Sequence, residues 1–409
     1  CKSVHFEPMK RISLLILTAA TSALTSFGAG KPEIRLVPLY EGLELTRPIS
    51  LQIPAGSERR FLVEQTGKIK ILPAEGSGGA SKVFFDMTDR MQVEKDFEEG
   101  LLGLAFHPQF KENGHFYLSF SRQGPKRLVL AEFSVSKDNP DLVDPESERV
   151  LLEVQQPDWN HNSGNVFFGP KDGMLYFCVG DGGTKNGVYL LSQRLTCWNG
   201  KVLRIDVNTR TASRPYGIPE DNPFLTTPLA CPEIWAWGLR NPWGAAIDPE
   251  TGQFFLADVG QDLFEEINLI EKGGNYGWNF REASHDFPWR QTLMESLGMK
   301  NEVPKDVVLL DPIHEYSRVD GLSITGGYVY RGQKIPALRG HFLYGDWRFG
   351  NLWALHYDAK TGAVVNHQIE KPADLSKPTV QPTGFFPDEN GEPLVLDWRG
   401  AIFRIAAAE

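Results

Sequence analysis

The stretch DWNHNSGNVFFGPKDGMLYFCVGDGG, from Asp158 to Gly183, carries more information than any other part of this 409-residue sequence. Its glycine-rich turn at Gly169–Gly173 separates two apolar segments, which predicts a β-hairpin. His161 stands just before the first segment and Asp181 just after the second. Because a hairpin brings the outer ends of its strands together, we expect the imidazole and the carboxylate at one edge of a sheet. Such a pair is typical of a general base.

The second half of this stretch belongs to a pattern that occurs six times along the chain. Each copy has a turn ending in glycine, an apolar strand, an acidic or polar residue and a second strand led by glycine. The copies begin at Gly56, Glu112, Lys171, Glu250, Arg339 and Asn390. A period of about 50 residues or more with several short strands per unit is typical of blades that bury their faces by stacking radially. The sequence therefore predicts an all-β fold, a six-bladed β-propeller.

The two ends of the chain are expected to share one blade. The last strand pair, Leu394–Ile405, and the early strand, Gly42–Pro54, would together close the ring. The segment Arg281–Tyr316 lacks the repeat and is expected to be a rim insertion, a position from which loops often shape access to a central site. We therefore expect a single propeller domain over residues 31–409, preceded by residues 1–30 as a separate segment.

The N-terminal segment has the pattern of a secretory signal peptide. Lys10 and Arg11 precede the apolar run Ile12–Leu24, and small residues follow at Ser26–Gly30. The run is too short and too weakly flanked for a transmembrane helix, so no membrane span is expected once the signal is removed. Residues Cys1–Pro8 are expected to be an upstream extension, without a lipidated cysteine. The protein is therefore predicted to be periplasmic or secreted.

Charge and cysteine content bear on partners and on redox chemistry. The formal net charge is -10 and no basic run is present, so nucleic acid is not expected as a partner. An exported protein can form disulfides, and Cys197 with Cys231 is one candidate pair, although the sequence leaves the connectivity open. Cys178 lies in an apolar run and is expected to be a buried small hydrophobe.

Polar, glycine-rich turns accompany the predicted strands and would converge on the axial channel of a propeller. In chain order, the motifs are GLLGLAFHP, HNSG with GDGG, GKVLRIDV, GLRNPWG, EEINLIEKGGNYGW and GGYVYRG. Together they resemble the glucose/sorbosone dehydrogenase family over about Glu33–Ile405. That family comprises six-bladed propellers that oxidise sugars with pyrroloquinoline quinone (PQQ) and calcium, and it includes Hedgehog-interacting-protein-like propellers. The motif DVGQDLFEEI, Asp258–Ile267, is more similar to the latter branch and its bacterial members.

The resemblance implies catalytic roles for three residues. His161 matches the family's general base, which takes the proton of the sugar's anomeric hydroxyl as hydride passes to the quinone. Asp181 matches the residue that orients this base and fixes its tautomer. Arg240 matches the arginine that supports negative charge on the reduced quinone. Judged from the residues alone, His161 could instead be a turn histidine, and Arg240 could form a salt bridge between blades.

The resemblance also implies contacts to the cofactor and the substrate. Arg240 and Asn241 would lie against the quinone. Arg348 stands where the family has a lysine, so the charge persists but a planar fork replaces a point donor. Glu98 and Asn160 match the substrate contacts, although the family's familiar residues there are glutamine and aspartate.

Calcium in the family bridges protein and cofactor through two consecutive backbone carbonyls. The matching positions are Gly260 and Gln261, with Gln261 in place of a proline. Backbone oxygens are hard ligands that suit calcium whatever the side chain. Asp258 and Asp262 could add carboxylates nearby, or could cap the turn.

The strongest departure from the family lies near the C-terminus. The well-known enzymes hold the carboxylates of the quinone with two arginines before the last blade's turn, whereas Lys377–Gly391 contains none. Thr379 and Gln381 stand at or near those positions, so Gln381 is the expected cofactor contact. Losing two charge-assisted contacts would weaken cofactor binding substantially. Three other cations could compensate: Lys185, Arg348 and Arg399.

Two functions from different classes follow. The first is an exported PQQ- and calcium-dependent aldose dehydrogenase with a sugar substrate and an external electron acceptor. The second is a cofactor-free propeller that binds protein or glycan. A calcium-dependent lactonase is disfavoured, because Arg240–Gly244 follows the quinone family. The sequence has no haem-attachment motif, and no motif in it specifies the sugar or the acceptor.

Overall fold

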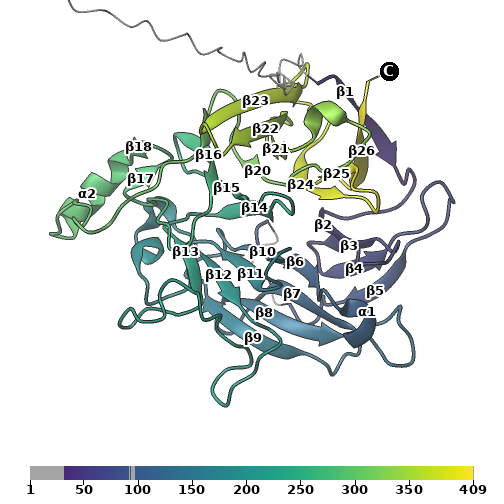
Figure 1. The fold of residues 1–409 in the computed structure, drawn as a ribbon, viewed down its shortest axis with the longest axis horizontal. Coiled ribbons are helices and arrows are strands. Elements are labelled where there is room, and N and C mark those ends of the chain that lie inside the picture. Colours follow the sequence, from purple (N-terminus) through teal and green to yellow (C-terminus); the bar gives the residue numbers. More distant parts are fainter. Residues whose placement is uncertain (1–31, 92, 94–96, 409) are drawn as a thin grey trace, which may run out of the picture. The chain divides into compact units, whose positions relative to one another are not determined.

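The computed structural model describes residues 32–408 except residue 92 and residues 94–96. The predicted extension and signal peptide lie outside these residues. Six four-stranded antiparallel sheets surround a central axis, as Figure 1 shows, which confirms the six-bladed β-propeller. Within the described residues, no helix is long and apolar enough to cross a membrane.

In five of the blades the strands follow chain order from the axis to the rim. The innermost strands are β2 (Pro48–Gln52), β6 (Leu101–Phe106), β10 (Ser163–Phe168), β14 (Pro242–Ile247), β20 (Ile324–Thr325) and β24 (Pro382–Pro387). The second strands are β3 (Phe61–Glu64), β7 (His115–Arg122), β11 (Leu175–Val179), β15 (Phe254–Asp258), β21 (Phe342–Asp346) and β25 (Pro393–Asp397). The third strands are β4 (Lys68–Ile71), β8 (Arg127–Ser134), β12 (Lys201–Ile205), β16 (Phe264–Leu269), β22 (Leu352–Asp358) and β26 (Ala401–Ala407). The outermost strands are β5 (Lys82–Asp86), β9 (Arg149–Gln155), β13 (Ile234–Trp237), β19 (His314–Ser317), β23 (Ala363–Glu370) and β1 (Ile34–Leu39).

The blade that closes the ring corrects one expectation. Its C-terminal strands are β24, β25 and β26, but its fourth strand is β1, which pairs with β26 so that Leu36 lies opposite Ile405. The segment Gly42–Pro54 instead contains β2, the innermost strand of the first blade. The burial patterns explain the difference, because four of the five residues of β2 are buried, as an axial strand requires, whereas none of the six residues of β1 is fully buried.

The rim insertion is shorter than predicted. The hairpin of β17 (Arg281–Glu282) and β18 (His285–Asp286) and the helix α2 (Pro288–Ser296) extend from the fourth blade (Figure 1). The end of the predicted insertion, however, forms β19, in which Tyr316 pairs with Glu265. The other helical segments are short: α1 (Phe110–Asn113) and the 3-10 turns Lys185–Gly187, Leu191–Gln193 and Pro336–Leu338.

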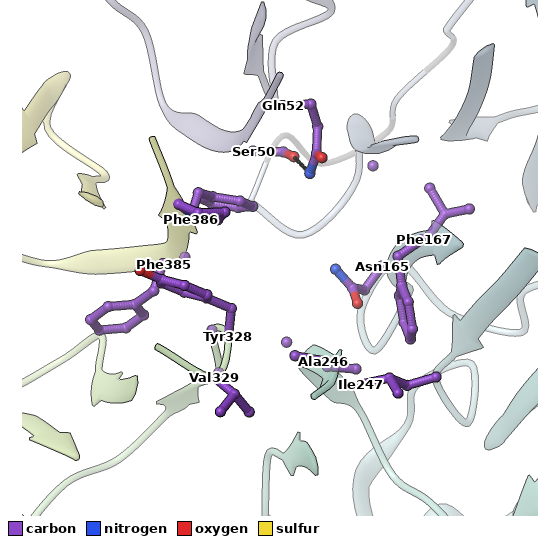
Figure 2. A pocket seen from close by; sticks show the side chains of 18 of the residues that line it. Ser50, Gln52, Asn165, Phe167, Ala246, Ile247, Tyr328, Val329, Phe385 and Phe386 are labelled. Atoms are coloured by element: carbon purple, nitrogen blue, oxygen red, sulfur yellow. Dashed lines mark hydrogen bonds between the residues drawn. The ribbon is translucent and has the colours of Figure 1, made fainter. Parts of the chain in front are cut away.

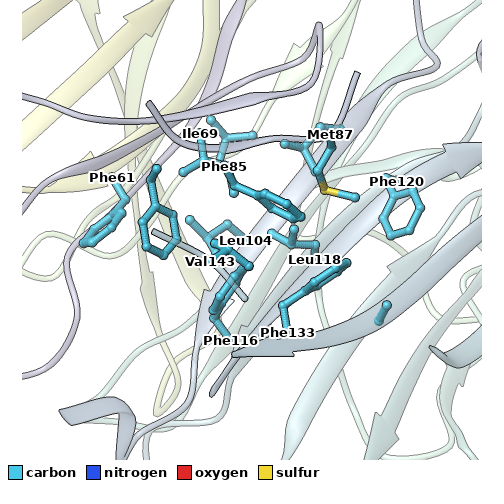
Figure 3. Close-up of a cluster of buried hydrophobic side chains, with 14 of the residues drawn as sticks. Phe61, Ile69, Phe85, Met87, Leu104, Phe116, Leu118, Phe120, Phe133 and Val143 are labelled. Atoms are coloured by element: carbon cyan, nitrogen blue, oxygen red, sulfur yellow. The ribbon is translucent and has the colours of Figure 1, made fainter. Parts of the chain in front are cut away.

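Aromatic side chains fill the spaces between blades. Figure 3 shows the cluster between the first two blades, with Phe61 and Phe85 from one and Phe116 and Phe133 from the other. The rings of Phe85 and Phe133 meet edge to face with centroids 5.2 Å apart, a favoured aromatic geometry. Each blade therefore buries its faces against its neighbours, as the repeat pattern predicts.

The cysteines take two kinds of position. Cys178 in β11 is fully buried, which confirms its predicted role as a small hydrophobe. Cys197 and Cys231 are both partly buried and both free, so the candidate disulfide is not formed in this structure.

Glycines let the innermost strands of neighbouring blades approach each other at the axis. A Cβ on Gly244 would lie 2.4 Å from the Cα of Gly326, and a Cβ on Gly326 would lie 2.5 Å from the carbonyl oxygen of Gly244. These contacts are between backbone atoms, which cannot rotate away as a side chain can. A similar close approach occurs between Gly103 and the carbonyl oxygen of Gly164. The width of the channel therefore depends on residues without a side chain.

We expect Gly326→Ala to lower the unfolding free energy by about 3 kcal/mol, because the new methyl group is overpacked against backbone. Gly362→Ala is the matched control, since that glycine has a positive φ of 71° but no atom within 4 Å of the added Cβ. The control should lose only about 1–2 kcal/mol, the strain of the left-handed backbone. Chemical denaturation of both variants tests this, and equal losses would contradict a sterically closed axis.

Candidate active site

Three polar side chains from two blades meet at one end of the axis. His161 precedes β10, Asp181 follows β11 and Arg240 precedes β14. The Nδ1 atom of His161 lies 2.7 Å from Oδ1 of Asp181, and its Nε2 atom lies 2.9 Å from Nη2 of Arg240. The three residues are between 3% and 8% exposed. The hairpin thus places His161 and Asp181 together as the sequence indicates, and Arg240 closes the group from the next blade.

The partners of His161 fix its tautomer. A guanidinium has only N–H donors, so Nε2 of His161 must accept the hydrogen bond from Arg240. The ring proton is therefore on Nδ1, where it is donated to Asp181. This tautomer leaves the lone pair on Nε2, which is the atom that a general base would use.

Asp181 is held by donors on both carboxylate oxygens. Gly183 donates its backbone N–H to Oδ1 at 3.0 Å, and the indole Nε1 of Trp278 donates to Oδ2 at 2.8 Å. The ring of Trp278 also lies 5.4 Å from the guanidinium carbon of Arg240, within cation–π range. Trp278 thus positions both partners of His161. No role was predicted for this residue, although its motif, KGGNYGW, is among the polar turns.

The backbone around His161 is held in an unusual conformation. His161 has a φ of 55°, and its N–H donates to Oε2 of Glu98 at 2.6 Å. Gly180 lies against it, since a Cβ there would be 1.9 Å from the His161 carbonyl oxygen. Non-glycine residues in this conformation cost free energy and persist where neighbours enforce them. Glu98 and Gly180 supply that enforcement here.

Asp258 anchors the turn that carries Arg240. Its carboxylate accepts the backbone N–H groups of Arg240 at 2.8 Å and Asn241 at 2.6 Å, so it caps this turn as one of the two sequence interpretations has it. Burial raises the pKa of Asp258 to about 6, and the nearby Asp181 charge adds to the rise, while the backbone donors oppose it. The side chain of Arg240 also donates from Nη1 to the carbonyl of Val259 at 2.7 Å.

Two buried atoms of the turn suit a bound ligand. Among the described residues, no hydrogen-bond partner reaches Nε of Arg240 or Oδ1 of Asn241, although both atoms are shielded from solvent. A buried donor and acceptor without partners are costly unless a ligand or water satisfies them. This donor and acceptor beside His161 fit the quinone end of a PQQ-like cofactor, which carries oxygen and nitrogen atoms of both kinds.

The turn that would bind calcium has its backbone carbonyls directed away from a buried acid. Oε1 of Glu282 accepts the N–H groups of Gln261 at 2.6 Å, Asp262 at 2.7 Å and Leu263 at 2.8 Å. Because N–H and C=O point in opposite directions across a peptide unit, the carbonyls of Gly260 and Gln261 face away from Glu282. In the part of the chain that the structure describes, no donor occupies these two carbonyl oxygens.

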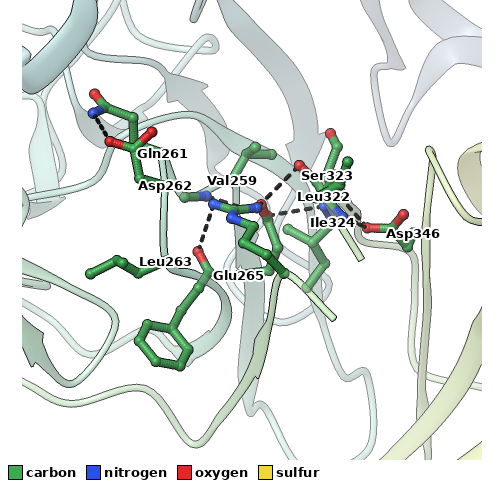
Figure 4. A network of polar contacts seen from close by, with 12 residues as sticks. Val259, Gln261, Asp262, Leu263, Glu265, Leu322, Ser323, Ile324 and Asp346 are labelled. Carbon is green, nitrogen blue, oxygen red and sulfur yellow. Dashed lines mark hydrogen bonds and ion pairs between the residues drawn. The ribbon is translucent and has the colours of Figure 1, made fainter. Parts of the chain in front are cut away.

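Figure 4 shows that the side chains near this turn are already engaged. Gln261 donates to Asp262 at 2.8 Å, and Glu265 pairs with Arg318 and accepts the N–H of Ile324 at 3.0 Å. No group of three or more His, Cys, Asp or Glu side chains with metal-binding geometry occurs in the described ranges. Calcium at this turn would therefore depend on backbone oxygens and on the ligand itself, as the sequence indicates.

The predicted substrate contacts lie beside His161. Glu98 holds the His161 backbone, and Asn160 is half-buried, with its Oδ1 2.3 Å from the point that a Cβ on Gly183 would occupy. Four aromatic rings surround this region: Phe97 packs on Trp159, Trp347 and Trp398 with centroids 5.9 to 6.4 Å apart. Polar groups with adjacent apolar rings are typical of small-molecule sites.

The three cations that could replace the two missing arginines differ in whether their side chains are already paired. Arg348 is exposed, and Gln381 is half-buried and directly precedes β24. Arg399, by contrast, pairs with Asp397 and donates to the carbonyl of Thr379 at 2.8 Å. Lys185 lies 5.7 Å from the ring of Trp289 in α2. All three cations are exposed, and Arg348 is the one for which the described residues provide no side-chain partner.

Asp258→Asn should change how stability depends on pH. The folded protein keeps a proton on Asp258 up to a pKa of about 6, against an ordinary value of 3.8, so the folded state binds more protons in this range. Its unfolding free energy therefore falls as pH rises through that range. Relative to Asp258→Asn, the wild type should lose up to roughly 3 kcal/mol between pH 4 and pH 7. Urea denaturation at several pH values measures this, and parallel curves would contradict it.

The chain is similar to a known family, to curated proteins and to solved structures. The profile of the family described as Glucose / Sorbosone dehydrogenase matches residues 45–375. Among curated proteins, the chain is 34% identical to the HIPL1 protein of Arabidopsis thaliana, covering 76% of this chain and 52% of that protein. It is 30% identical to the human Hedgehog-interacting protein, covering 86% and 49% of the two chains. It is also 30% identical to quinoprotein glucose dehydrogenase B of Acinetobacter calcoaceticus, covering 86% and 73%.

The chain spans about half the length of the HIPL1 and Hedgehog-interacting proteins that it matches. Among solved structures, the PQQ-bound aldose sugar dehydrogenase of Streptomyces coelicolor has the same fold, with a TM-score of 0.68 at 19% identity over 93% of this chain and 100% of that one. The family match covers most of the propeller, and the axial His161 site lies within it. The chain therefore belongs to the glucose/sorbosone dehydrogenase family.

Proposed function

We propose that this propeller is a PQQ- and calcium-dependent aldose dehydrogenase. The observation that carries the proposal is the His161 imidazole, which lies 2.7 Å from Asp181 and 2.9 Å from Arg240 with its Nε2 lone pair toward the arginine. A base, an orienting carboxylate and a cation at one axial site are the groups that sugar oxidation requires. Export to the periplasm or the exterior is part of the proposal and rests on the N-terminal segment.

In the proposed reaction, His161, Asp181 and Arg240 each have a separate role. PQQ, when bound, supplies the group that accepts the hydride. His161 accepts the proton of the anomeric hydroxyl at Nε2, and Asp181 stabilises the imidazolium that results. For this to happen, the substrate hydroxyl must replace Arg240 as the partner of Nε2. The freed guanidinium would then hold the quinone end of PQQ and supply a positive charge beside it.

The other predicted site residues would contact the cofactor, the calcium ion or the sugar. Arg240 and Asn241 would hold the quinone end of the cofactor, and Arg348 and Gln381 would face its carboxylates. The carbonyls of Gly260 and Gln261 would bind calcium, close to Arg240 because Val259 already contacts the guanidinium. Glu98 and Asn160 would contact the sugar. An external acceptor would then remove the electrons.

The second function, a binding module without a cofactor, is favoured by the residue at position 381 and by the matched relatives. The carboxylate end of the cofactor site has a neutral Gln381 where the well-known enzymes have an arginine, and the matched relatives include Hedgehog-interacting protein. A propeller with this change could bind a protein or a glycan without a cofactor. Cofactor affinity separates the two functions.

Purified protein supplied with PQQ and calcium should bind the cofactor at micromolar concentration and reduce a dye with an aldose from a test panel. His161→Ala should leave the absorbance change of cofactor binding intact and lower turnover by roughly 10²–10⁴-fold, the usual worth of a general base. His285→Ala is the control, since His285 pairs with Glu315 on the rim hairpin. An absence of cofactor binding to the wild type would reject the dehydrogenase and favour the binding module.

Gln381→Arg tests the weak point of the cofactor site. A new charge-assisted hydrogen bond to a cofactor carboxylate should tighten PQQ binding by roughly tenfold or more. Gln109→Arg adds the same charge at an exposed position before α1, where β6 ends, and should leave the affinity unchanged. Titration of PQQ into both variants measures this. Equal affinities would show that the cofactor carboxylates do not lie near residue 381.

A further inference from the structure

The axial channel has a cavity at the end opposite His161. Its volume is about 380 Å³, and its lining includes residues from every blade (Figure 2). His161 precedes β10, whereas the lining residue Phe167 lies near the end of that strand. In the same way, Arg240 precedes β14, and the lining residue Ile247 is the last residue of β14. The cavity also reaches Trp243, near the start of β14, whose indole donates to the carbonyl of Thr383 in the last blade at 3.2 Å. Among the described residues that line the cavity, none is His161, Asp181 or Arg240, so the cavity is separate from the candidate active site.

One side of the cavity is polar. Ser50 and Gln52 contribute a hydroxyl and a carboxamide that are hydrogen-bonded to each other at 3.2 Å, and Asn165 extends beside them (Figure 2). The Oδ1 atom of Asn165 is shielded from solvent, and no donor among the residues that the structure describes reaches it. A buried acceptor without a donor is costly, so this oxygen favours a ligand that brings one.

The other sides of the cavity are apolar. Figure 2 shows Phe386 and Tyr328 across the cavity from Asn165, and Ala246 and Ile247 below it. Water needs several polar partners to fill a cavity favourably, and Phe386, Ala246 and Ile247 offer none from their side chains. A ligand with one polar edge and apolar faces matches the two kinds of wall.

The lining has no unpaired charge. Arg331 is its sole charged residue, and the guanidinium is held by Asp248, with Nε 2.9 Å from Oδ1, and by Glu250 at 2.8 Å. The phenol of Tyr328 donates to the carbonyl of Gly391 at 3.3 Å, and burial raises its pKa, so it stays neutral. A charged ligand would therefore enter without a counter-charge, which is unfavourable.

We infer that this cavity is a second ligand site, which binds a small, neutral, planar aromatic molecule with a hydroxyl or amine donor on one edge. The donor reaches Oδ1 of Asn165, and the rings of Phe167 and Phe386 cover the faces. The volume lies in the range of about 300–1,000 Å³ that is typical of small-molecule sites. Binding here requires neither PQQ nor calcium.

Fluorescence titration of 2-naphthol into the cofactor-free protein at pH 7 tests this site, with 2-methylnaphthalene as a probe of the same shape without a donor. We expect saturable binding of both probes with a stoichiometry of one. Asn165→Leu should weaken 2-naphthol at least tenfold and leave 2-methylnaphthalene unchanged, because the substitution removes the acceptor and keeps the volume. Ala246→Phe should weaken both probes by filling the cavity, and 2-naphthoate, an anion, should bind at least tenfold more weakly than 2-naphthol.

Three results would overturn the inference. The first is an absence of saturable 2-naphthol binding to the wild type. The second is an equal effect of Asn165→Leu on the two probes. The third is loss of binding in His161→Ala, which would place the probe at the other end of the channel. Thermal melting of each variant confirms that it is folded, and if Asn165→Leu is not, Ala246→Phe and His161→Ala decide the outcome.

Discussion

The close approach of the innermost strands at the axis is the constraint on which the rest of the structure depends. Gly244 and Gly326 leave no room for a Cβ between neighbouring blades. Between the third and fourth blades, Ser163 donates to the carbonyl of Pro242 at 2.5 Å, and His161 and Arg240, each two residues earlier in the chain, come within hydrogen-bond distance. The close approach also leaves, at the far end, a channel wide enough for a small molecule.

Carboxylates at or just after the ends of second strands hold turns in several blades. Asp258 and Asp346, which end their second strands, and Asp397 in the closing blade accept backbone N–H groups. Asp181 lies two residues beyond the matching position, which Val179 occupies, because Ser163 pairs with Val179 as Pro242 pairs with Asp258. Asp181 also accepts a backbone N–H, that of Gly183, but its oxygens contact His161 and Trp278 as well. The carboxylate of the candidate site therefore combines the holding of a turn with a contact to the imidazole.

Local and repeated features were predictable from the sequence, whereas contacts between blades were not. The hairpin that joins His161 to Asp181 is marked by its own turn, and the six repeats define the blades. The closing strand was assigned wrongly, because β1 is a short, half-exposed edge strand whose partner is at the other end of the chain. Trp278 was missed because an indole that donates to a carboxylate in another blade has no local signature. The far cavity was equally hidden, since every blade contributes to it.

The hydrogen bond between Arg240 and His161 makes two events mutually exclusive. Nε2 of a neutral histidine has one lone pair, so it accepts from the guanidinium or from an incoming hydroxyl, but not from both at once. A ligand that draws the arginine aside therefore also vacates the position of the next reactant. In the proposed dehydrogenase this single contact therefore favours one order of binding, in which the ligand that engages Arg240 arrives before the hydroxyl that gives up its proton.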